Sequence, residues 1–281
     1  MTQASVPARA AIFDLDGTIV DSEPGSQAAL RQLFDENAVP YTDELIAQFV
    51  GRRGTEVFAE LDLFPARNPA DLAAEVDRLH RVMDLPPVLP FAGAVRLVHK
   101  IHQAGDPLGL VTSGHRCYAV PRLEQLGLLE LFAVIVTADD VTAGKPDAEG
   151  YLRACRELGV DAQHCVVFED SPAGVAAAKA GGLYCVAVVT THQRSQLGQA
   201  DRVVADLAEV TWPVPVPADA SRLPAPRDRL PTAQVGSGRL RIPAHLVLSC
   251  LGPRAQHHQV DVDVRWPGYR PRDSVGNVFV G

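Results

Sequence analysis

Apolar residues recur along this chain in two different rhythms. Between residues 23 and 90 they follow the spacing of amphipathic helices, and loops at 37–40, 51–54 and 64–69 separate the groups. This pattern predicts a small module of about four helices. Beyond residue 91, helical spacing alternates with short, nearly continuous apolar runs, which are typical of parallel strands covered on both faces.

The second rhythm predicts a regular alternation of elements. We expect helices over residues 92–104, 118–126, 147–158 and 172–180, and strands over 107–112, 134–137, 164–169, 184–189 and 202–204. An apolar run at 10–13 predicts a first strand ahead of the helical module. The expected fold class is α/β, a doubly wound, Rossmann-like parallel sheet core with a small helical cap inserted after the first strand. In this interpretation residues 1–21 and 91–212 form the core, and residues 22–90 form the cap.

The composition changes at residue 213. Ten of the 22 prolines lie beyond Trp212, and this segment contains neither lysine nor glutamate. Apolar and polar residues alternate over 260–266, which is compatible with one half-buried strand. We otherwise expect residues 213–281 to form a Pro- and Arg-rich, poorly ordered C-terminal extension. A misassigned reading frame would produce the same pattern.

Charge and cysteine content limit the classes of function. Residues 1–212 contain 17 Lys and Arg against 29 Asp and Glu, a net charge of −12, whereas the remainder carries +4. An acidic body argues against nucleic acid as the main ligand. The five cysteines form no C-x-x-C pair, and there is neither a signal-peptide pattern nor an apolar run of membrane-spanning length. We therefore expect a cytoplasmic protein without a membrane partner. We also expect a monomer or a weak homodimer.

Two carboxylates follow the first predicted strand. Asp14 and Asp16 occupy alternate positions where this strand ends, and a glycine turn follows them. Two acids and a freed backbone carbonyl in one small volume suit a hard divalent cation such as Mg²⁺ and a nucleophilic carboxylate. These are the parts needed for phosphoryl transfer through an aspartyl-phosphate. A solvated turn at a strand end would carry the same pair, so the D-x-D pattern alone leaves both interpretations open.

Three further polar groups follow later strands or open helices. Thr112 and Ser113 end a strand and could donate hydrogen bonds to a phosphate oxygen, or Ser113 could simply cap the next helix. Pro146 fits the first position of a helix, so Lys145 would lie at the helix entrance and could hold a phosphate, or it could be a solvated lysine. Glu169 and Asp170 leave a buried strand and could complete a Mg²⁺ shell, or Asp170 could be a capping group. Their order and their placement favour one phosphoryl-transfer site.

These motifs give the chain a strong resemblance to the haloacid dehalogenase superfamily. The matching segments are Asp-Leu-Asp-Gly-Thr at 14–18, Thr-Ser-Gly at 112–114, Gly-Lys-Pro-Asp at 144–147 and Glu-Asp-Ser-Pro-Ala-Gly at 169–174. The resemblance covers residues 9–212. The segments 21–24 and 144–151 are most similar to the branch with small helical caps, which includes sugar and polyol phosphatases, phosphoglycolate phosphatases and β-phosphoglucomutases.

The resemblance implies a role for each matching residue. Asp14 would be the nucleophile that becomes phosphorylated, and Asp16 would protonate the leaving alcohol and then deprotonate the hydrolytic water. Asp14, the backbone carbonyl of Asp16 and Asp170 would bind Mg²⁺, with support from Glu169. The residues expected to hold phosphoryl oxygens are Thr112, Ser113 and Lys145.

The resemblance also implies that the cap is mobile, closes over the site and excludes water. The loop at 51–54 would face the substrate, although a solvated turn would equally account for Arg52 and Arg53. The other residues expected to contact substrate are Glu23, His115 and Arg116. The expected partner is a small phosphorylated metabolite.

Departures from the family pattern narrow the expected reaction. The name-giving dehalogenases lack the second acid, so Asp16 argues against dehalogenation. β-Phosphoglucomutases carry a histidine after the first motif, where this chain has Ser26, and an arginine in the cap loop, where it has Gly54. Arg116, close behind the Thr-Ser-Gly segment, is similar to phosphatases of small polyol and deoxysugar phosphates. We therefore expect a Mg²⁺-dependent phosphatase of small phosphate monoesters, with a phosphomutase or a non-catalytic binding module as the alternatives.

Overall fold

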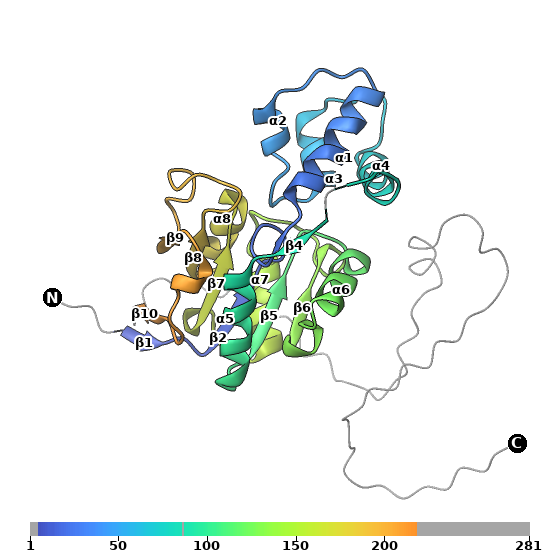
Figure 1. The fold of residues 1–281 in the computed structure, drawn as a ribbon. Helices are drawn as coiled ribbons and strands as arrows, with labels where there is room; N and C mark the ends of the chain where they lie inside the picture. Colours follow the sequence, from blue (N-terminus) through green and yellow to red (C-terminus); the bar gives the residue numbers. More distant parts are fainter. Residues whose placement is uncertain (1–4, 86, 218–281) are drawn as a thin grey trace, which may run out of the picture. The chain divides into compact units, whose positions relative to one another are not determined.

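The computed structural model describes residues 5–85 and 87–217, and a parallel sheet lies at its centre (Figure 1). The strands are β2 (Ala10–Phe13), β5 (Leu108–Val111), β6 (Val134–Val136), β7 (Cys165–Glu169), β8 (Tyr184–Val188) and β9 (Arg202–Val204). They lie in the order β6-β5-β2-β7-β8-β9, and each neighbouring pair is parallel. The first strand of the sheet is therefore near its middle, with later strands added on both sides. This arrangement confirms the predicted doubly wound α/β fold.

Helices cover both faces of this sheet. They are α5 (Ala92–Gln103), α6 (Arg116–Gln125), α7 (Glu149–Leu158) and α8 (Pro172–Ala180). One apolar cluster joins α5 and α6 to strand residues such as Phe13, and the other joins α7 and α8 to residues such as Ile12. Successive strand residues point to opposite faces of the sheet. Because helices cover both faces, neighbouring residues such as Ile12 and Phe13 are both buried, and the strands are continuous apolar runs in the sequence.

The cap is a helical insertion between two short strands. Its helices are α1 (Glu23–Glu36), α2 (Asp43–Ala47), α3 (Gly54–Leu61) and α4 (Pro69–Val82), and the flanking strands are β3 (Val20–Asp21) and β4 (Leu89–Pro90). β3 and β4 pair antiparallel, so they bring the two connections to the cap together. The cap has its own apolar core, in which the rings of Phe34, Phe49, Phe58 and Phe64 meet edge to face.

Four short 3₁₀ turns complete the described part of the core: Leu129–Leu131, Ala138–Asp140, Ala162–His164 and Leu207–Glu209.

Two helix starts differ from the prediction. α6 begins at Arg116, two residues earlier than expected, and α7 begins at Glu149, so Pro146 precedes that helix instead of opening it. In the described ranges, no helix combines the length and the apolar character needed to cross a membrane.

The expected start of the poorly ordered extension, at residue 213, is wrong for residues 213–217. β10 (Pro215–Pro217) pairs antiparallel with β1 (Ser5–Pro7), and Val214 and Val216 are buried in the same apolar cluster as Phe13. Backbone pairing and burial of two valines therefore hold this segment on the core. The remainder of the extension, including the candidate strand at 260–266, lies outside the described residues.

Candidate active site

Three neighbouring strands deliver the acidic and hydroxyl residues to one edge of the sheet. Asp14 follows β2, Thr112 follows β5, and Glu169 ends β7. β5 and β7 are the two neighbours of β2, and all three strands run parallel. Their carboxyl ends therefore meet at the point where the direction of strand addition reverses, which is where ligands bind in open α/β sheets.

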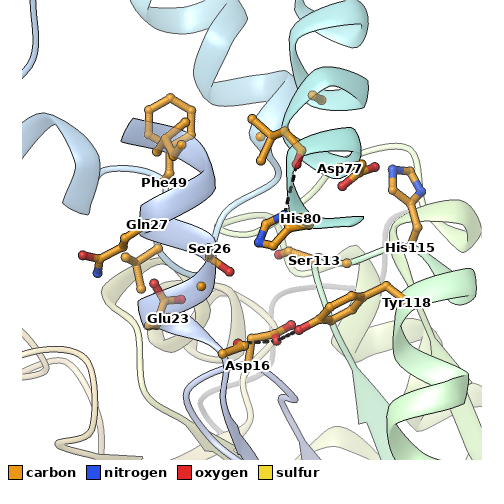
Figure 2. A pocket seen from close by; sticks show the side chains of 18 of the residues that line it. Asp16, Glu23, Ser26, Gln27, Phe49, Asp77, His80, Ser113, His115 and Tyr118 are labelled. Atoms are coloured by element: carbon orange, nitrogen blue, oxygen red, sulfur yellow. Dashed lines mark hydrogen bonds between the residues drawn. The ribbon is translucent and has the colours of Figure 1, made fainter. Parts of the chain in front are cut away.

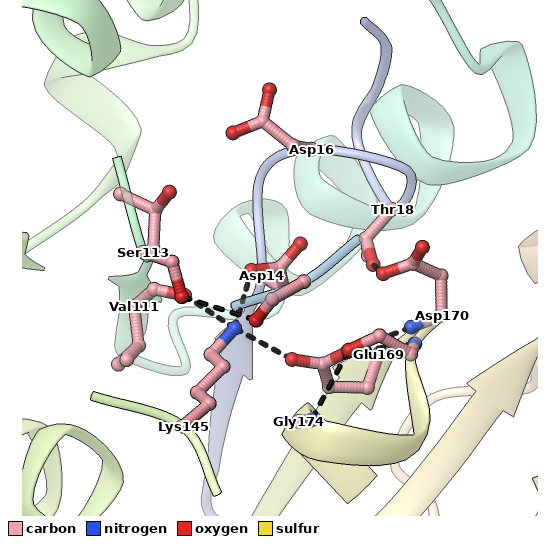
Figure 3. A network of polar contacts seen from close by, with 12 residues as sticks. Asp14, Asp16, Thr18, Val111, Ser113, Lys145, Glu169, Asp170 and Gly174 are labelled. Carbon is pink, nitrogen blue, oxygen red and sulfur yellow. Dashed lines mark hydrogen bonds and ion pairs between the residues drawn. The ribbon is translucent and has the colours of Figure 1, made fainter. Parts of the chain in front are cut away.

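Lys145 lies inside the carboxylate group. Its Nζ donates to Asp14 Oδ1 at 2.5 Å, to Glu169 Oε1 at 2.6 Å and to the Val111 carbonyl at 3.3 Å (Figure 3). The Lys145 side chain is only 5% exposed. The solvated-loop interpretation of this lysine is therefore wrong, because its ammonium group is buried against two acids.

Both oxygens of Glu169 already accept hydrogen bonds. Oε1 receives the Lys145 ammonium and the Tyr151 hydroxyl, the latter at 2.7 Å. Oε2 receives the backbone N–H groups of Asp170 and Ser171 at 2.9 and 3.1 Å, and the Ser171 hydroxyl at 3.1 Å. Burial alone would raise the pKa of Glu169, but Lys145 and these donors lower it. Glu169 therefore stays ionised and holds Lys145 in place.

The arrangement fits a divalent cation. Carboxylate oxygens of Asp14, Glu169 and Asp170 lie within 4.8 Å of one another, and all three residues are buried. Burial, with the charges of Glu169 and Asp16, raises the pKa of Asp14 to about 8 although Lys145 acts to lower it. Burial, with Glu169 and Asp14, raises the pKa of Asp170 well above its usual range. One lysine does not balance three acids, and a divalent ion bound to carboxylate oxygens would supply the missing positive charge.

Gly17 makes room for this cluster. Its backbone has φ +79°, which side chains rarely tolerate, and a Cβ at this position would lie 2.1 Å from Asp170 Oδ2. The next residue, Thr18, also contacts Asp170, because its hydroxyl donates to Oδ1 at 3.3 Å. The turn that follows β2 therefore brings the first and the last motif into contact.

Asp16 points away from the lysine and the cluster (Figure 3). Its Oδ1 accepts the hydroxyls of Ser22 and Tyr118, each at 2.6 Å. Its side chain is not part of the acidic cluster, so any metal contact would use its backbone carbonyl, as the resemblance implies. Burial and the nearby Asp16 raise the pKa of Tyr118 well above its usual range, so this phenol stays protonated and donates.

The hydroxyls expected to hold phosphate occupy different positions. Thr112 is buried beside the site, and its Oγ1 accepts the backbone N–H of Gly114 at 3.0 Å. Ser113 donates instead to the carbonyl of Gly51 in the cap loop, at 3.1 Å. Ser113 is also not the cap of α6, because His115 occupies that position. Its hydroxyl links the core to the cap.

A cavity of about 590 Å³ opens above Asp14 and Asp16, between the core and the cap. Glu23, Ser26 and Gln27 of α1 line one wall, and Asp77 and His80 of α4 line another, with Tyr118 near the base (Figure 2). Of the other residues expected to contact substrate, Arg52, Arg53 and His115 also line the cavity. Polar groups from three elements therefore surround the space next to the buried acids.

Several predicted substrate residues also have protein partners. Arg116 is not among the residues that line the cavity, because its guanidinium binds Asp140 Oδ2 at 2.7 Å and the Ile135 carbonyl at 2.8 Å. His115 lies 2.6 Å from Asp139 Oδ1. Arg53 donates to three core carbonyls, those of Thr142, Ala138 and Val141, at 3.1 to 3.3 Å. Arg53 therefore docks the cap, in addition to bordering the cavity.

Sequence reasoning missed Tyr118 and His80. Tyr118 lies on α6 and His80 on α4, and neither belongs to one of the four matching segments. Tyr118 is six residues beyond Thr112, which is the right distance to reach back over the strand end once α6 starts at residue 116. That spacing is the one signal that could have indicated Tyr118.

Comparisons with known proteins assign the family. A family model described as haloacid dehalogenase-like hydrolase matches residues 11–188. The chain is 44% identical over 206 residues to validoxylamine A 7'-phosphate phosphatase from Streptomyces hygroscopicus subsp. limoneus, which covers 73% of this chain and 97% of that protein. It is 34% identical to hexitol phosphatase A from Escherichia coli, over 71% and 92% of the two proteins. The solved structure of CbbY from Rhodobacter sphaeroides in complex with phosphate matches with a TM-score of 0.63 at 25% identity, over 72% of this chain and 96% of that one.

The structure is a doubly wound α/β protein with a buried lysine and three acids at the point where the direction of strand addition reverses, an arrangement that could hold a divalent cation. The chain belongs to the haloacid dehalogenase-like hydrolases. It is a phosphoric monoester hydrolase of that family.

Proposed function

We propose that the protein is a Mg²⁺-dependent phosphatase of small phosphorylated carbohydrates that works through an aspartyl-phosphate on Asp14. The observation that carries the proposal is the ion pair of Asp14 with Lys145, 2.5 Å apart, at the base of a cavity that Asp16 also lines. A carboxylate can approach a phosphate dianion only where positive charge offsets the repulsion. Lys145 provides part of that charge.

In the first step, a carboxylate oxygen of Asp14 attacks phosphorus. The bond between phosphorus and the ester oxygen breaks, and its electron pair goes to the leaving oxygen, which takes a proton from Asp16. The alcohol departs, Asp16 becomes a carboxylate, and Asp14 carries the phosphoryl group. Lys145 and the backbone beyond Thr112 hold the phosphoryl oxygens.

In the second step, Asp16 removes a proton from a water molecule whose oxygen attacks phosphorus. The bond between phosphorus and Asp14 breaks, Asp14 regains its carboxylate, and inorganic phosphate leaves. Asp16 thereby returns to its protonated form, so each turnover consumes one water and needs no other reactant. The cap lies over the site and limits the access of other water molecules.

Asp14, Asp170 and the backbone carbonyl of Asp16 would hold Mg²⁺, because oxygen ligands suit this ion and Glu169 is already occupied by donors. The ion supplies positive charge against the phosphoryl oxygens. Removal of divalent ions with a chelator is expected to stop phosphate release, and added Mg²⁺ is expected to restore it.

The relatives and the cavity support a carbohydrate as the leaving group. The similar proteins include a validoxylamine A 7'-phosphate phosphatase, a hexitol phosphatase and a fructose-1-phosphate phosphatase. Here the cavity offers carboxylate, amide, imidazole and hydroxyl groups from Glu23, Gln27, His80 and Tyr118. Groups of this kind pair with the hydroxyls of a sugar or polyol.

The decisive test is Asp14→Asn. We expect this variant to release no phosphate from a panel of fructose 1-phosphate, glucitol 6-phosphate and 2-phosphoglycolate, whereas Asp161→Asn, an exposed change at the opposite end of β7, retains wild-type rates. Rapid quenching of the wild type with borohydride should reduce the acyl phosphate and leave homoserine at position 14. Undiminished turnover by Asp14→Asn would refute the mechanism.

The same panel separates the alternatives. A phosphomutase would convert one phosphate isomer into another and release little phosphate, and the phosphatase relatives argue against this outcome. A binding module would show no turnover of any ester with Mg²⁺ present. The intact set of Asp14, Asp16, Lys145 and Asp170 supports a working enzyme.

A further inference from the structure

Two hydroxyls bind the same oxygen of the Asp16 carboxylate. Ser22 Oγ and the Tyr118 hydroxyl each donate to Oδ1 at 2.6 Å, and in the part of the chain that the structure describes no hydrogen bond reaches Oδ2. All three residues line the cavity, and the Tyr118–Asp16 bond crosses its base (Figure 2). The two oxygens of this carboxyl group are therefore in different environments.

The ring of Tyr118 packs close to Arg122 and Gly114. The guanidinium of Arg122, one helical turn further along α6, lies 4.5 Å from the ring centroid. Gly114 leaves room for the ring, because a Cβ at this position would lie 3.1 Å from Cδ1 of the ring. The ring is thus accommodated beside the strand end, with its hydroxyl bound to Asp16.

We propose that Tyr118 is a positioning residue that makes Oδ2 of Asp16 the proton-carrying oxygen. An oxygen that accepts two hydrogen bonds has both lone pairs engaged, so the acid proton of Asp16 belongs on Oδ2. Asp16 lines the cavity, where the leaving oxygen of the substrate would lie, so Oδ2 is the oxygen that would give it the proton. The inference rests on the proposed function, because it assigns a geometry to the proton transfer by Asp16.

The consequence is a dependence on the leaving group. When the ester bond breaks, its electron pair stays on the leaving oxygen, which then takes the proton from Oδ2. A stable anion such as p-nitrophenolate departs with little help from an acid, whereas the more basic phenolate needs the proton. Loss of the Tyr118 hydroxyl should therefore slow the transfer from phenyl phosphate more than the transfer from p-nitrophenyl phosphate.

The experiment measures kcat/KM of the wild type and of Tyr118→Phe with these two esters in the presence of Mg²⁺. For an enzyme with a covalent intermediate, kcat/KM reports the steps up to departure of the leaving group and excludes the attack of water. We expect Tyr118→Phe to lower the value about tenfold for phenyl phosphate and less than about twofold for p-nitrophenyl phosphate. Ser22→Ala should change the ratio of the two values in the same direction.

The matched control is Tyr41→Phe, which removes a hydroxyl that lies 3.5 Å from an Asp35 oxygen on the exposed side of the cap. It should leave both values unchanged. Thermal unfolding of each variant checks that the fold is intact. Equal losses with both esters would indicate a merely structural role for Tyr118 and overturn the inference, as would no loss with either ester.

Two further results distinguish a positioning role for Tyr118 from a direct contact with substrate, and distinguish failure of this inference from failure of the proposed function. If Tyr118 acts through Asp16, then Tyr118→Phe has no additional effect in the Asp16→Asn background. An undiminished effect in that background would assign Tyr118 a direct contact with substrate and overturn the inference. Failure of the proposed function looks different, because the wild type itself would then release no phosphate from either ester or from the sugar phosphates.

Discussion

Lys145 gives the sharpest prediction about how the site is held together. Its ammonium group is buried between Asp14 and Glu169, at 2.5 and 2.6 Å. Replacing it in Lys145→Met removes one partner of a buried ion pair, which typically costs about 3–5 kcal/mol. Because the pKa of Asp14 is already raised to about 8, protonation can relieve part of the remaining charge, and we expect a loss near the lower end, about 3 kcal/mol.

The loss is measured as a change in Tm. For a protein of this size, 1 kcal/mol corresponds to roughly 2–4 °C, so Lys145→Met should unfold about 6–12 °C below the wild type in the presence of a chelator. Lys100→Met is the matched control, because Lys100 is exposed on α5. Addition of Mg²⁺ should raise the Tm of Lys145→Met more than that of the wild type, since the ion becomes the main positive charge among the three acids.

Two results would refute this reasoning. A fall in Tm for Lys145→Met no greater than that for Lys100→Met would mean that the ion pair contributes little to the fold. An equal effect of Mg²⁺ on Lys145→Met and the wild type would mean that the ion and the lysine do not act on the same carboxylates. Phosphate release by Lys145→Met should fall in either case, since the residue also faces the phosphoryl group in the proposed mechanism.

Two other substitutions test the cap. Burial and the nearby Asp16 raise the pKa of Glu23 to about 7. In the unfolded chain Glu23 ionises at its ordinary, lower pKa, so the folded state loses stability as the pH rises from that ordinary pKa to about 7. The Tm of Glu23→Gln relative to the wild type should therefore increase between pH 5 and pH 8, and a change of the opposite sign would contradict the assignment. Arg53→Ala removes three hydrogen bonds that dock the cap on core carbonyls. Arg53→Ala should lower kcat/KM for a sugar phosphate about tenfold, because it weakens closure of the cap. The control is Arg96→Ala on the exposed face of α5, which should change nothing. Equal rates for the two variants would show that Arg53 does not hold the cap.

Local patterns in the sequence were sufficient for most of the elements. The predicted bounds of β2, α8 and β9 agree with the structure, and those of α5, β5 and β8 differ by one or two residues. α8 was predictable because Ser171 caps it and Pro172 opens it, and both signals are local. The start of α7 was misplaced because Pro146 resembles a helix opener, but the backbone enters the helix three residues later.

The convergence of Asp14, Thr112, Glu169 and Asp170 at one edge also followed from sequence, because the carboxyl ends of parallel strands meet. Lys145 lies in the loop before α7, and its place in the site was expected from the order of the motifs and from the resemblance. What the sequence could not indicate was the direction of individual side chains. Tyr118 and Asp16 are 102 residues apart, and their hydrogen bond depends on how α6 leaves the strand. The same holds for Ser113, whose hydroxyl binds the cap loop, and for the pairing of β10 with β1.

The sequence by itself determined the class of fold, the edge that carries the site and the acids and lysine within it, because hydrophobic period, caps and strand-end motifs are properties of neighbouring residues. The tertiary structure decided which oxygen of Asp16 is held, that Arg53 docks the cap on core carbonyls, and how Glu169 and Lys145 share their contacts. These features depend on angstrom-scale distances between segments far apart in the chain, and such distances exist only once the sheet, its helices and the cap have packed together.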